Sequence, residues 1–175
     1  MRVDRRGVAS ARDITLLCLD VDGVLTDGGI ILDGHGVESK RFHVRDGTGL
    51  RVWMKLGYEV ALITGRRGSA LQHRARELDI RHLVQGSLDK AADLDGIRKT
   101  LGITAEATAV IADDLPDLPM MRRAGYPIAV ADAVDEVQAA AAFITRLPGG
   151  HGAVREAIEH LLTARRRWHE AVSLF

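Results

Sequence analysis

A short apolar run, Leu16–Leu19, ends directly at two closely spaced aspartates, Asp20 and Asp22. Such a run, bounded by polar residues and a glycine, is typical of a strand buried on both faces in a parallel sheet. Asp20 then lies at the carboxyl end of the strand, where open α/β sheets bind their ligands. Residues two apart in an extended chain point the same way, so both carboxylates could face one crevice. Carboxylates that close repel each other unless they share a cation or a proton; the alternative is a solvated, Asp-rich turn.

Short apolar runs recur along the chain and alternate with segments of helical periodicity. The expected further strands are 58–63, 82–84, 109–111, 128–130 and 143–145, and the expected helices are 50–56, 69–78, 89–101, 117–124, one from 135 and one from 153 to 172. This alternation predicts an α/β fold with a doubly wound parallel sheet, Rossmann-like in class. Ser69 and Gln72 fit a capping box at one helix start.

The region between the first two strands is too short for a separate cap domain. Apolar and mixed residues on both sides of Asp33–Gly36 predict a β-hairpin there. Residues 1–13 are expected to form a flexible leader, and residues 14–175 a single domain.

Composition excludes several classes of protein. The 175 residues contain 24 basic and 24 acidic side chains, which gives no reason to expect nucleic-acid or membrane binding. The single cysteine, Cys18, allows no intrachain disulfide and favours a reducing compartment. No apolar segment resembles a signal peptide or a membrane span. We therefore expect a soluble, cytoplasmic protein.

Polar side chains follow the later strands at the same relative place. Thr64 follows the second strand, Lys90 comes after the third, and Asp113 and Asp114 follow the fourth. Right-handed crossovers bring these strand ends to one edge of the sheet. Carboxylates without a cluster of His or Cys favour Mg²⁺ over Zn²⁺. The sequence thus predicts a magnesium site with a hydroxyl and an ammonium that could hold an anion.

These motifs resemble those of a known superfamily. The sequences D-V-D-G-V-L-T-D, I-T-G-R, a lysine and D-D-L-P-D are similar to the four-motif set of the haloacid dehalogenase superfamily. Within the capless branch of this superfamily, the chain resembles the 3-deoxy-D-manno-octulosonate 8-phosphate phosphatase family over about residues 16–162. The residues that carry this closer resemblance are F-H-V-R-D-G at 42–47, Arg66, Arg74 and G-G-H-G-A-V-R-E at 149–156. The resemblance implies a haloacid dehalogenase-like fold and a Mg²⁺-dependent phosphatase of a sugar-acid phosphate, in lipopolysaccharide precursor synthesis.

The resemblance also implies catalytic roles. Asp20 would be the nucleophile that forms an aspartyl-phosphate, and Asp22 the general acid and base. Mg²⁺ would be held by Asp20, the backbone carbonyl of Asp22, and Asp113. Thr64 and Lys90 would hold the phosphate oxygens.

Further residues are assigned by the same resemblance. Asp114 would orient Lys90 or a metal-bound water, and a role as a cap or turn residue is equally open. The implied substrate-binding residues are Asp22, His43, Val44, Arg45, Asp46, Gly47, Arg51, Arg66, Arg74 and Lys90.

The chain departs from the family pattern at two positions. Ala112 replaces the usual glycine before the aspartate pair and would be strained if its φ were positive. His151 replaces a strong cation in the G-G-x-G loop.

The resemblance to family members without a cap also implies a homotetramer with shared active sites. In such a tetramer, the hairpins of different subunits pair with each other, and the C-terminal tail of one subunit reaches the active site of a neighbour.

Other functions remain open at this point. A phosphatase of a nine-carbon, sialic-type acid 9-phosphate is the nearest alternative. A phospho-accepting receiver domain also combines aspartates, a threonine and a lysine on a doubly wound sheet, although its motifs come in another order. A catalytically silent interaction module is the third alternative, against which the full set of polar residues argues.

Overall fold

The computed structural model describes residues 9–175 and contains a six-stranded parallel sheet in the order β5-β4-β1-β6-β7-β8. The central strand β1 pairs with β4 on one side and with β6 on the other. The strands are β1 (Leu16–Leu19), β4 (Glu59–Thr64), β5 (His82–Gln85), β6 (Thr108–Ala112), β7 (Tyr126–Ala129) and β8 (Phe143–Ile144). All four residues of β1 are buried, as the continuous apolar run predicts. The predicted doubly wound parallel sheet is confirmed.

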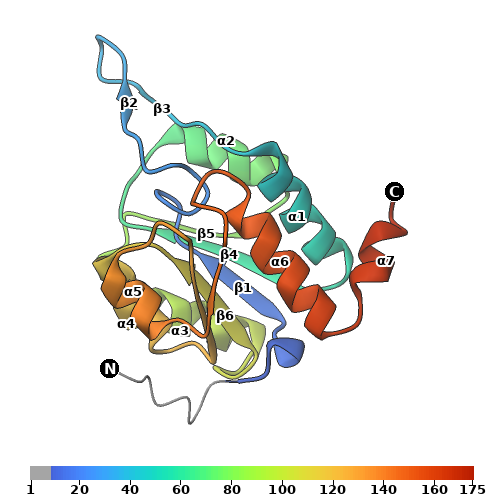
Figure 1. Cartoon of the computed structure of the whole chain (residues 1–175). Helices are drawn as coiled ribbons and strands as arrows, with labels where there is room; N and C mark the ends of the chain where they lie inside the picture. The colour runs from blue at the N-terminus through green and yellow to red at the C-terminus, as the bar shows by residue number, and fades with distance from the viewer. Residues whose placement is uncertain (1–8) are drawn as a thin grey trace.

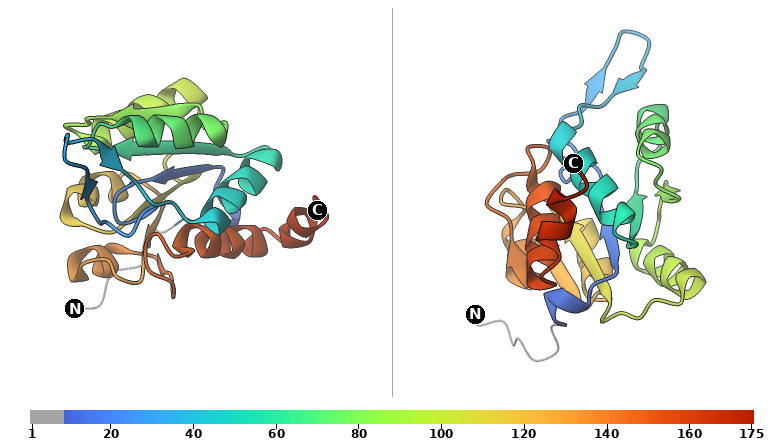
Figure 2. Two further views of the ribbon diagram at one scale, coloured as in Figure 1. Left: turned by 90° about the horizontal axis from the view of Figure 1, so that it is seen from above. Right: turned by 90° about the vertical axis from the view of Figure 1, so that its right-hand side faces the viewer.

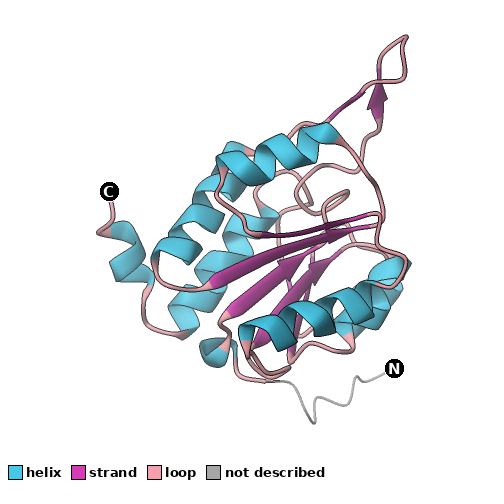
Figure 3. Cartoon of the chain, turned by 180° about the vertical axis from the view of Figure 1, so that it is seen from behind, coloured by secondary structure: helices cyan, strands magenta, loops and turns pink. Residues whose placement is uncertain are grey.

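Helices cover both faces of this sheet (Figure 3). One layer consists of α1 (Val44–Lys55), α2 (Ser69–Glu77) and α6 (Ala153–Ala164), with α1 and α6 side by side (Figure 1). The other layer consists of α3 (Lys90–Leu101), α4 (Leu118–Met121) and α5 (Asp135–Ala140). The short helices are η1 (Ala11–Asp13), η2 (Leu115–Asp117) and α7 (Trp168–Val172).

The first residues of the fold belong to the segment that we expected to be a leader. Residues 1–8 of that segment lie outside the described residues. The amide of Ala9 donates a hydrogen bond to the carbonyl of Gly125 at 2.8 Å, and η1 follows it. The fold thus includes part of the predicted leader. Across 9–175, no helix has the length and apolar character that crossing a membrane requires.

A two-stranded antiparallel hairpin, β2 (Ile31–Leu32) and β3 (Glu38–Ser39), joins β1 to α1. It extends away from the body of the domain, as the right-hand view of Figure 2 shows. Its apolar side chains are exposed rather than packed on the core of the chain: Ile30, Ile31, Leu32 and Val37.

The capping box predicted at the start of α2 is wrong. Gly68, not Ser69, is the N-cap residue, and it has an extended φ of −176°. No side chain caps this helix; instead the amide of Gly68 donates to Oε1 of Gln85 at 2.8 Å. A contact with the neighbouring strand β5 therefore sets where α2 begins.

The single amphipathic helix predicted from residue 153 to 172 is also wrong, because it is broken between α6 and α7. Arg166 has a left-handed φ of 59°. The guanidinium groups of Arg165 and Arg167 lie 4.6 and 5.2 Å from the ring centroid of Tyr58. These arginines thus hold the break against Tyr58, which lies between α1 and β4.

Candidate active site

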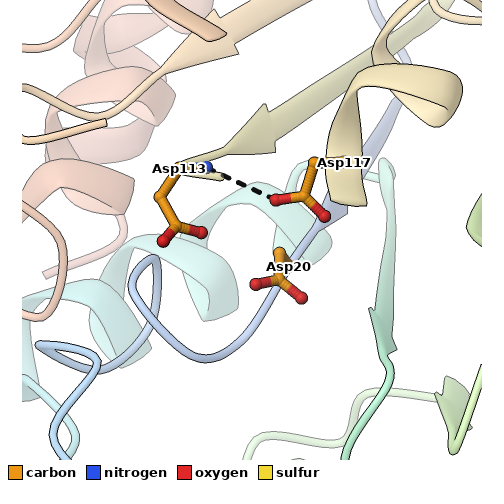
Figure 4. A group of neighbouring side chains, drawn as sticks. All are labelled: Asp20, Asp113 and Asp117. Carbon is orange, nitrogen blue, oxygen red and sulfur yellow. Dashed lines mark hydrogen bonds between the residues drawn. The ribbon is translucent and has the colours of Figure 1, made fainter. Parts of the chain in front are cut away.

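Three polar side chains gather at the carboxyl edge of the central strands. Asp20 follows β1, Thr64 ends β4, and Asp113 follows β6. Since β1 pairs in parallel with both neighbours, the three residues meet at one edge of the sheet. Carboxylate oxygens of Asp20, Asp113 and Asp117 lie within 4.8 Å of one another (Figure 4).

Lys90 reaches this cluster from the first turn of α3. The preceding residue, Asp89, caps the helix by accepting hydrogen bonds from the amides of Ala91 and Ala92. The ammonium of Lys90 donates to Oδ1 of Asp20 and Oδ1 of Asp117, each at 2.6 Å. Burial opposes its charge, but the two carboxylates raise its pKa above the ordinary value. Lys90 is therefore a fixed cation beside Asp20.

The residue that holds Lys90 is Asp117 and not Asp114. Asp117 is buried, and its other oxygen accepts a hydrogen bond from the amide of Asp113 at 3.4 Å (Figure 4). Asp114 is exposed, and its Oδ1 caps η2 by accepting from the amide of Leu115 at 2.7 Å. Sequence reasoning placed Asp117 only at a helix start; the signal that could have found it is its position in D-D-L-P-D.

The aspartates of the cluster are short of positive charge. Burial, with added repulsion from Asp117, raises the pKa of Asp20 to about 6, although Lys90 works in the opposite direction. Burial and the carboxylates of Asp20 and Asp117 raise the pKa of Asp113 to about 8. Oδ1 of Asp113 is buried and finds no hydrogen-bond partner among residues 9–175. A cation bound by oxygen ligands fits this site, as Mg²⁺ requires.

The loop after β1 leaves room for Asp113. Gly23 has a φ of +94°, and a Cβ there would lie 2.0 Å from Oδ2 of Asp113. Only glycine combines this conformation with such a close approach. Asp22 lies just before Gly23, and its carboxylate contacts the ammonium of Lys40 and lies 4.0 Å from Nε of Arg66.

Thr64 and Ala112 are placed by strand geometry. The hydroxyl of Thr64 is buried and accepts a hydrogen bond from the amide of Arg66 at 3.2 Å. Ala112 is the last residue of β6 and is absent from the non-glycine residues with positive φ between residues 9 and 175. Its replacement of glycine therefore causes no backbone strain.

The predicted F-H-V-R-D-G segment has a structural part in the fold. The buried carboxylate of Asp46 accepts a hydrogen bond from the amide of Arg155 at 2.8 Å, and so joins α1 to the first turn of α6. A Cβ on Gly47 would lie 2.2 Å from Nη2 of Arg74, so Gly47 admits that arginine. His43 is the N-cap residue of α1 without a side-chain cap, and its ring lies near Gly152.

The remaining predicted substrate-binding residues lie in different places. Val44 is 74% exposed, and Arg45 is exposed beside the 148–152 loop. Arg51 donates to the carbonyl of Glu77, at the far end of α2 from the aspartate cluster. Arg74 lies over the ring of Phe42 and pairs with Glu77 at 2.8 Å. Of the predicted arginines, Arg66 is therefore the one placed beside Asp22.

The glycine-rich loop before α6 packs against the loop after β1. The amide of Gly150 donates to the carbonyl of Val24 at 3.0 Å, and a Cβ on Gly149 would lie 1.7 Å from the carbonyl oxygen of Gly23. Nδ1 of His151 lies 2.7 Å from the carbonyl of Gly149. This loop therefore supports the aspartate site within its own chain.

Known proteins share this architecture over almost the whole chain. A family model described as haloacid dehalogenase-like hydrolase matches residues 80–158. The 3-deoxy-D-manno-octulosonate 8-phosphate phosphatase of Escherichia coli (strain K12) is 43% identical over 94% of this chain and 87% of that protein. The corresponding phosphatase of Moraxella catarrhalis, solved in complex with magnesium, phosphate and KDO, is 42% identical with a TM-score of 0.92, covering 95% of each chain.

A third comparison agrees with these two. The cobalt-bound phosphatase of Haemophilus influenzae is 39% identical, with a TM-score of 0.88 over 90% of this chain and 92% of that one. Such similarity across the full domain separates this chain from receiver domains. The chain therefore belongs to the 3-deoxy-D-manno-octulosonate 8-phosphate phosphatase family of the haloacid dehalogenase-like hydrolases.

Proposed function

We propose that this protein is a Mg²⁺-dependent phosphatase that hydrolyses 3-deoxy-D-manno-octulosonate 8-phosphate through an aspartyl-phosphate. The observation that carries the proposal is the meeting of Asp20, Asp113 and Lys90 at one edge of the sheet. The relatives named for this reaction share about two fifths of the sequence, which supports the choice of substrate.

In the first step, a carboxylate oxygen of Asp20 attacks phosphorus, and the bond between phosphorus and the sugar oxygen breaks. Asp22 donates its proton to that oxygen, which leaves as the sugar hydroxyl. Thr64 and Lys90 hold the phosphoryl oxygens on which negative charge is spread. The position of Lys90, 2.6 Å from Asp20, is suited to this role.

In the second step, Asp22 takes a proton from water as the water oxygen attacks phosphorus. The bond between phosphorus and Asp20 breaks, which releases inorganic phosphate and restores both aspartates. When bound, Mg²⁺ supplies positive charge that lowers the repulsion between Asp20 and the phosphate. Asp20, Asp113 and the backbone carbonyl of Asp22 would hold the ion.

Phosphate release from a panel of sugar phosphates, with and without a chelator, tests the proposal. The eight-carbon sugar-acid 8-phosphate should be the best substrate, and Asp20→Asn should abolish turnover while circular dichroism stays unchanged. Turnover by a folded Asp20→Asn variant would refute the mechanism. Preference for a nine-carbon, sialic-type acid 9-phosphate would replace the substrate, and no turnover at all would favour a silent interaction module.

We also propose that the protein is a homotetramer with shared active sites. The hairpin exposes four large apolar side chains, which single soluble domains rarely leave uncovered as a group. Among residues 9–175, the segment between β1 and β4 contributes the hairpin and α1 but no cap that would exclude water from the aspartyl-phosphate. Sedimentation should give four times 19.0 kDa; a fully active monomer would refute this.

A cytoplasmic location stays a prediction, which cell fractionation would test.

Arg66 and Arg74 are proposed to select a substrate that bears a carboxylate as well as a phosphate. Thr64 and Lys90 already serve the phosphate, and a guanidinium matches a carboxylate with two parallel hydrogen bonds. Arg74 lines a surface groove together with Lys40 and Phe42, which gives a substrate anion access to it.

A further inference from the structure

The base of the hairpin carries a ring of four alternating charges beside the aspartate site. Lys40, just after β3, contacts Oδ1 of Asp22 and lies 3.5 Å from Oε1 of Glu38. Glu38 in turn accepts from Nη2 of Arg66 at 2.5 Å. Arg66 closes the ring at 4.0 Å from Oδ2 of Asp22. Side chains at the base of the hairpin thus join it to the loop after β1, which carries Asp22, and to the loop after β4, which carries Arg66.

Lys40 is unusually buried for a lysine, with 4% of its side chain exposed. A buried ammonium is costly unless carboxylates compensate it, and a hairpin could be attached by apolar contacts instead. Within residues 9–175, Oδ2 of Asp22 is buried without a hydrogen-bond partner. Among residues 9–175, Lys40 therefore makes the direct hydrogen bond that orients the Asp22 carboxylate, and Arg66 faces the other oxygen from 4.0 Å.

We propose that Lys40 is a positioning residue for the reaction and acts through Asp22. It holds the Asp22 carboxylate toward the place where the sugar oxygen leaves and water later attacks, while Glu38 holds Lys40 and Arg66 in place. This inference rests on the proposed function, which makes Asp22 the general acid and base. It gives the hairpin a part in the chemistry in addition to any part in assembly.

Two substrates with different leaving groups test this role. Proton donation by Asp22 matters for a sugar alkoxide, and matters little for 4-nitrophenolate, which leaves without a proton. General acid catalysis contributes about 10²–10⁴-fold, so partial misplacement of Asp22 should cost about 10- to 100-fold in kcat/KM for the sugar-acid phosphate. The variant that tests this misplacement is Lys40→Met. With 4-nitrophenyl phosphate as substrate, its kcat/KM should fall by less than about threefold, because the leaving group needs no proton from Asp22.

Matched variants separate this effect from damage to the fold. Arg41→Met removes the ion pair between the neighbouring residue Arg41 and Asp27, a pair that does not contact Asp22. This variant should keep nearly the full kcat/KM for both substrates. Lys40→Arg should recover most of the sugar-phosphate activity. Glu38→Gln should give a smaller loss with the same preference between substrates, and it serves if Lys40→Met does not fold.

The outcomes are distinct. An equal fall in kcat/KM for both substrates in Lys40→Met would show that Lys40 only attaches the hairpin, and would overturn the inference. The same conclusion would follow if Arg41→Met lost as much kcat/KM as Lys40→Met. Full activity of Lys40→Met would overturn it as well. Failure of the wild-type protein to hydrolyse either substrate would instead refute the proposed function, and the inference with it. Sedimentation and melting temperature of each variant complete the comparison.

Discussion

Replacement of Asp117 by asparagine tests the link between Lys90 and the catalytic edge. The substitution keeps the size of the side chain but removes the charge that receives a hydrogen bond from Lys90 at 2.6 Å. Asp114→Asn is the matched control, because Asp114 is exposed and asparagine caps a helix as well as aspartate does. The two positions are three residues apart and differ in what they contact.

Two effects of Asp117→Asn oppose each other. Loss of a hydrogen bond to a charged group costs roughly 1.5–3 kcal/mol, which corresponds to about a 10- to 100-fold fall in kcat/KM. Loss of the negative charge also lowers the pKa of Asp20, which Asp117 raises, and so favours the ionised nucleophile. Since Lys90 keeps its contact with Asp20, we expect about a tenfold net loss, at the weaker end of that range.

Steady-state kinetics with saturating Mg²⁺, together with melting temperatures, measures this balance. Asp114→Asn should stay within about twofold of the wild-type protein, because its cap is retained. An equal or larger loss in Asp114→Asn would show that Lys90 is not held through Asp117 in the working enzyme. Unchanged activity of Asp117→Asn would refute the reasoning on the ion pair.

Three further predictions concern the site. Gly23→Ala should weaken Mg²⁺ binding about tenfold or more, because the new Cβ meets Asp113. Gly36→Ala is the control, since Gly36 also has a positive φ but has open space around it, and it should leave Mg²⁺ binding unchanged. Equal effects of the two substitutions on Mg²⁺ binding would contradict the close-approach argument. Mg²⁺ should bind more tightly as pH rises from 6 to 8.5, since Asp113, with a pKa of about 8, must lose its proton first, and an affinity by calorimetry that does not change with pH would contradict this. Arg74→Ala should lower kcat/KM by about 10- to 100-fold for the sugar-acid phosphate and far less for a neutral aryl phosphate; equal losses would assign Arg74 to its contact with Glu77.

The sheet and the place of the catalytic edge could be predicted because local signals coincide there. An apolar run that ends at Asp20 and another that ends at Asp113 fix both a strand and its carboxyl end. Helix ends with local chemistry were predictable in the same way: Asp89 caps α3, and Gly102 ends it with a φ of 66°.

The features that were missed depend on contacts between distant residues. The start of α2 is set by Gln85 on another strand, and the end of α6 by Tyr58. The pairing of Asp117 with Lys90 joins two helices that no local pattern connects. A single sequence carries no periodicity that reports such pairs. The motif D-D-L-P-D marks Asp117 as a candidate, but its contact with Lys90 is known only from the structure.

The central place of β1 has a consequence for synthesis on the ribosome. Its partners β4 and β6 are both translated later, and β6 much later, so one edge of this fully buried strand stays unpaired on the growing chain. A nascent or truncated chain that ends before Thr108 exposes an apolar edge that can pair with other chains. Premature stops in the first half of the gene should therefore yield aggregates and not partly active fragments, and delayed elongation before β6 should increase the demand for chaperones.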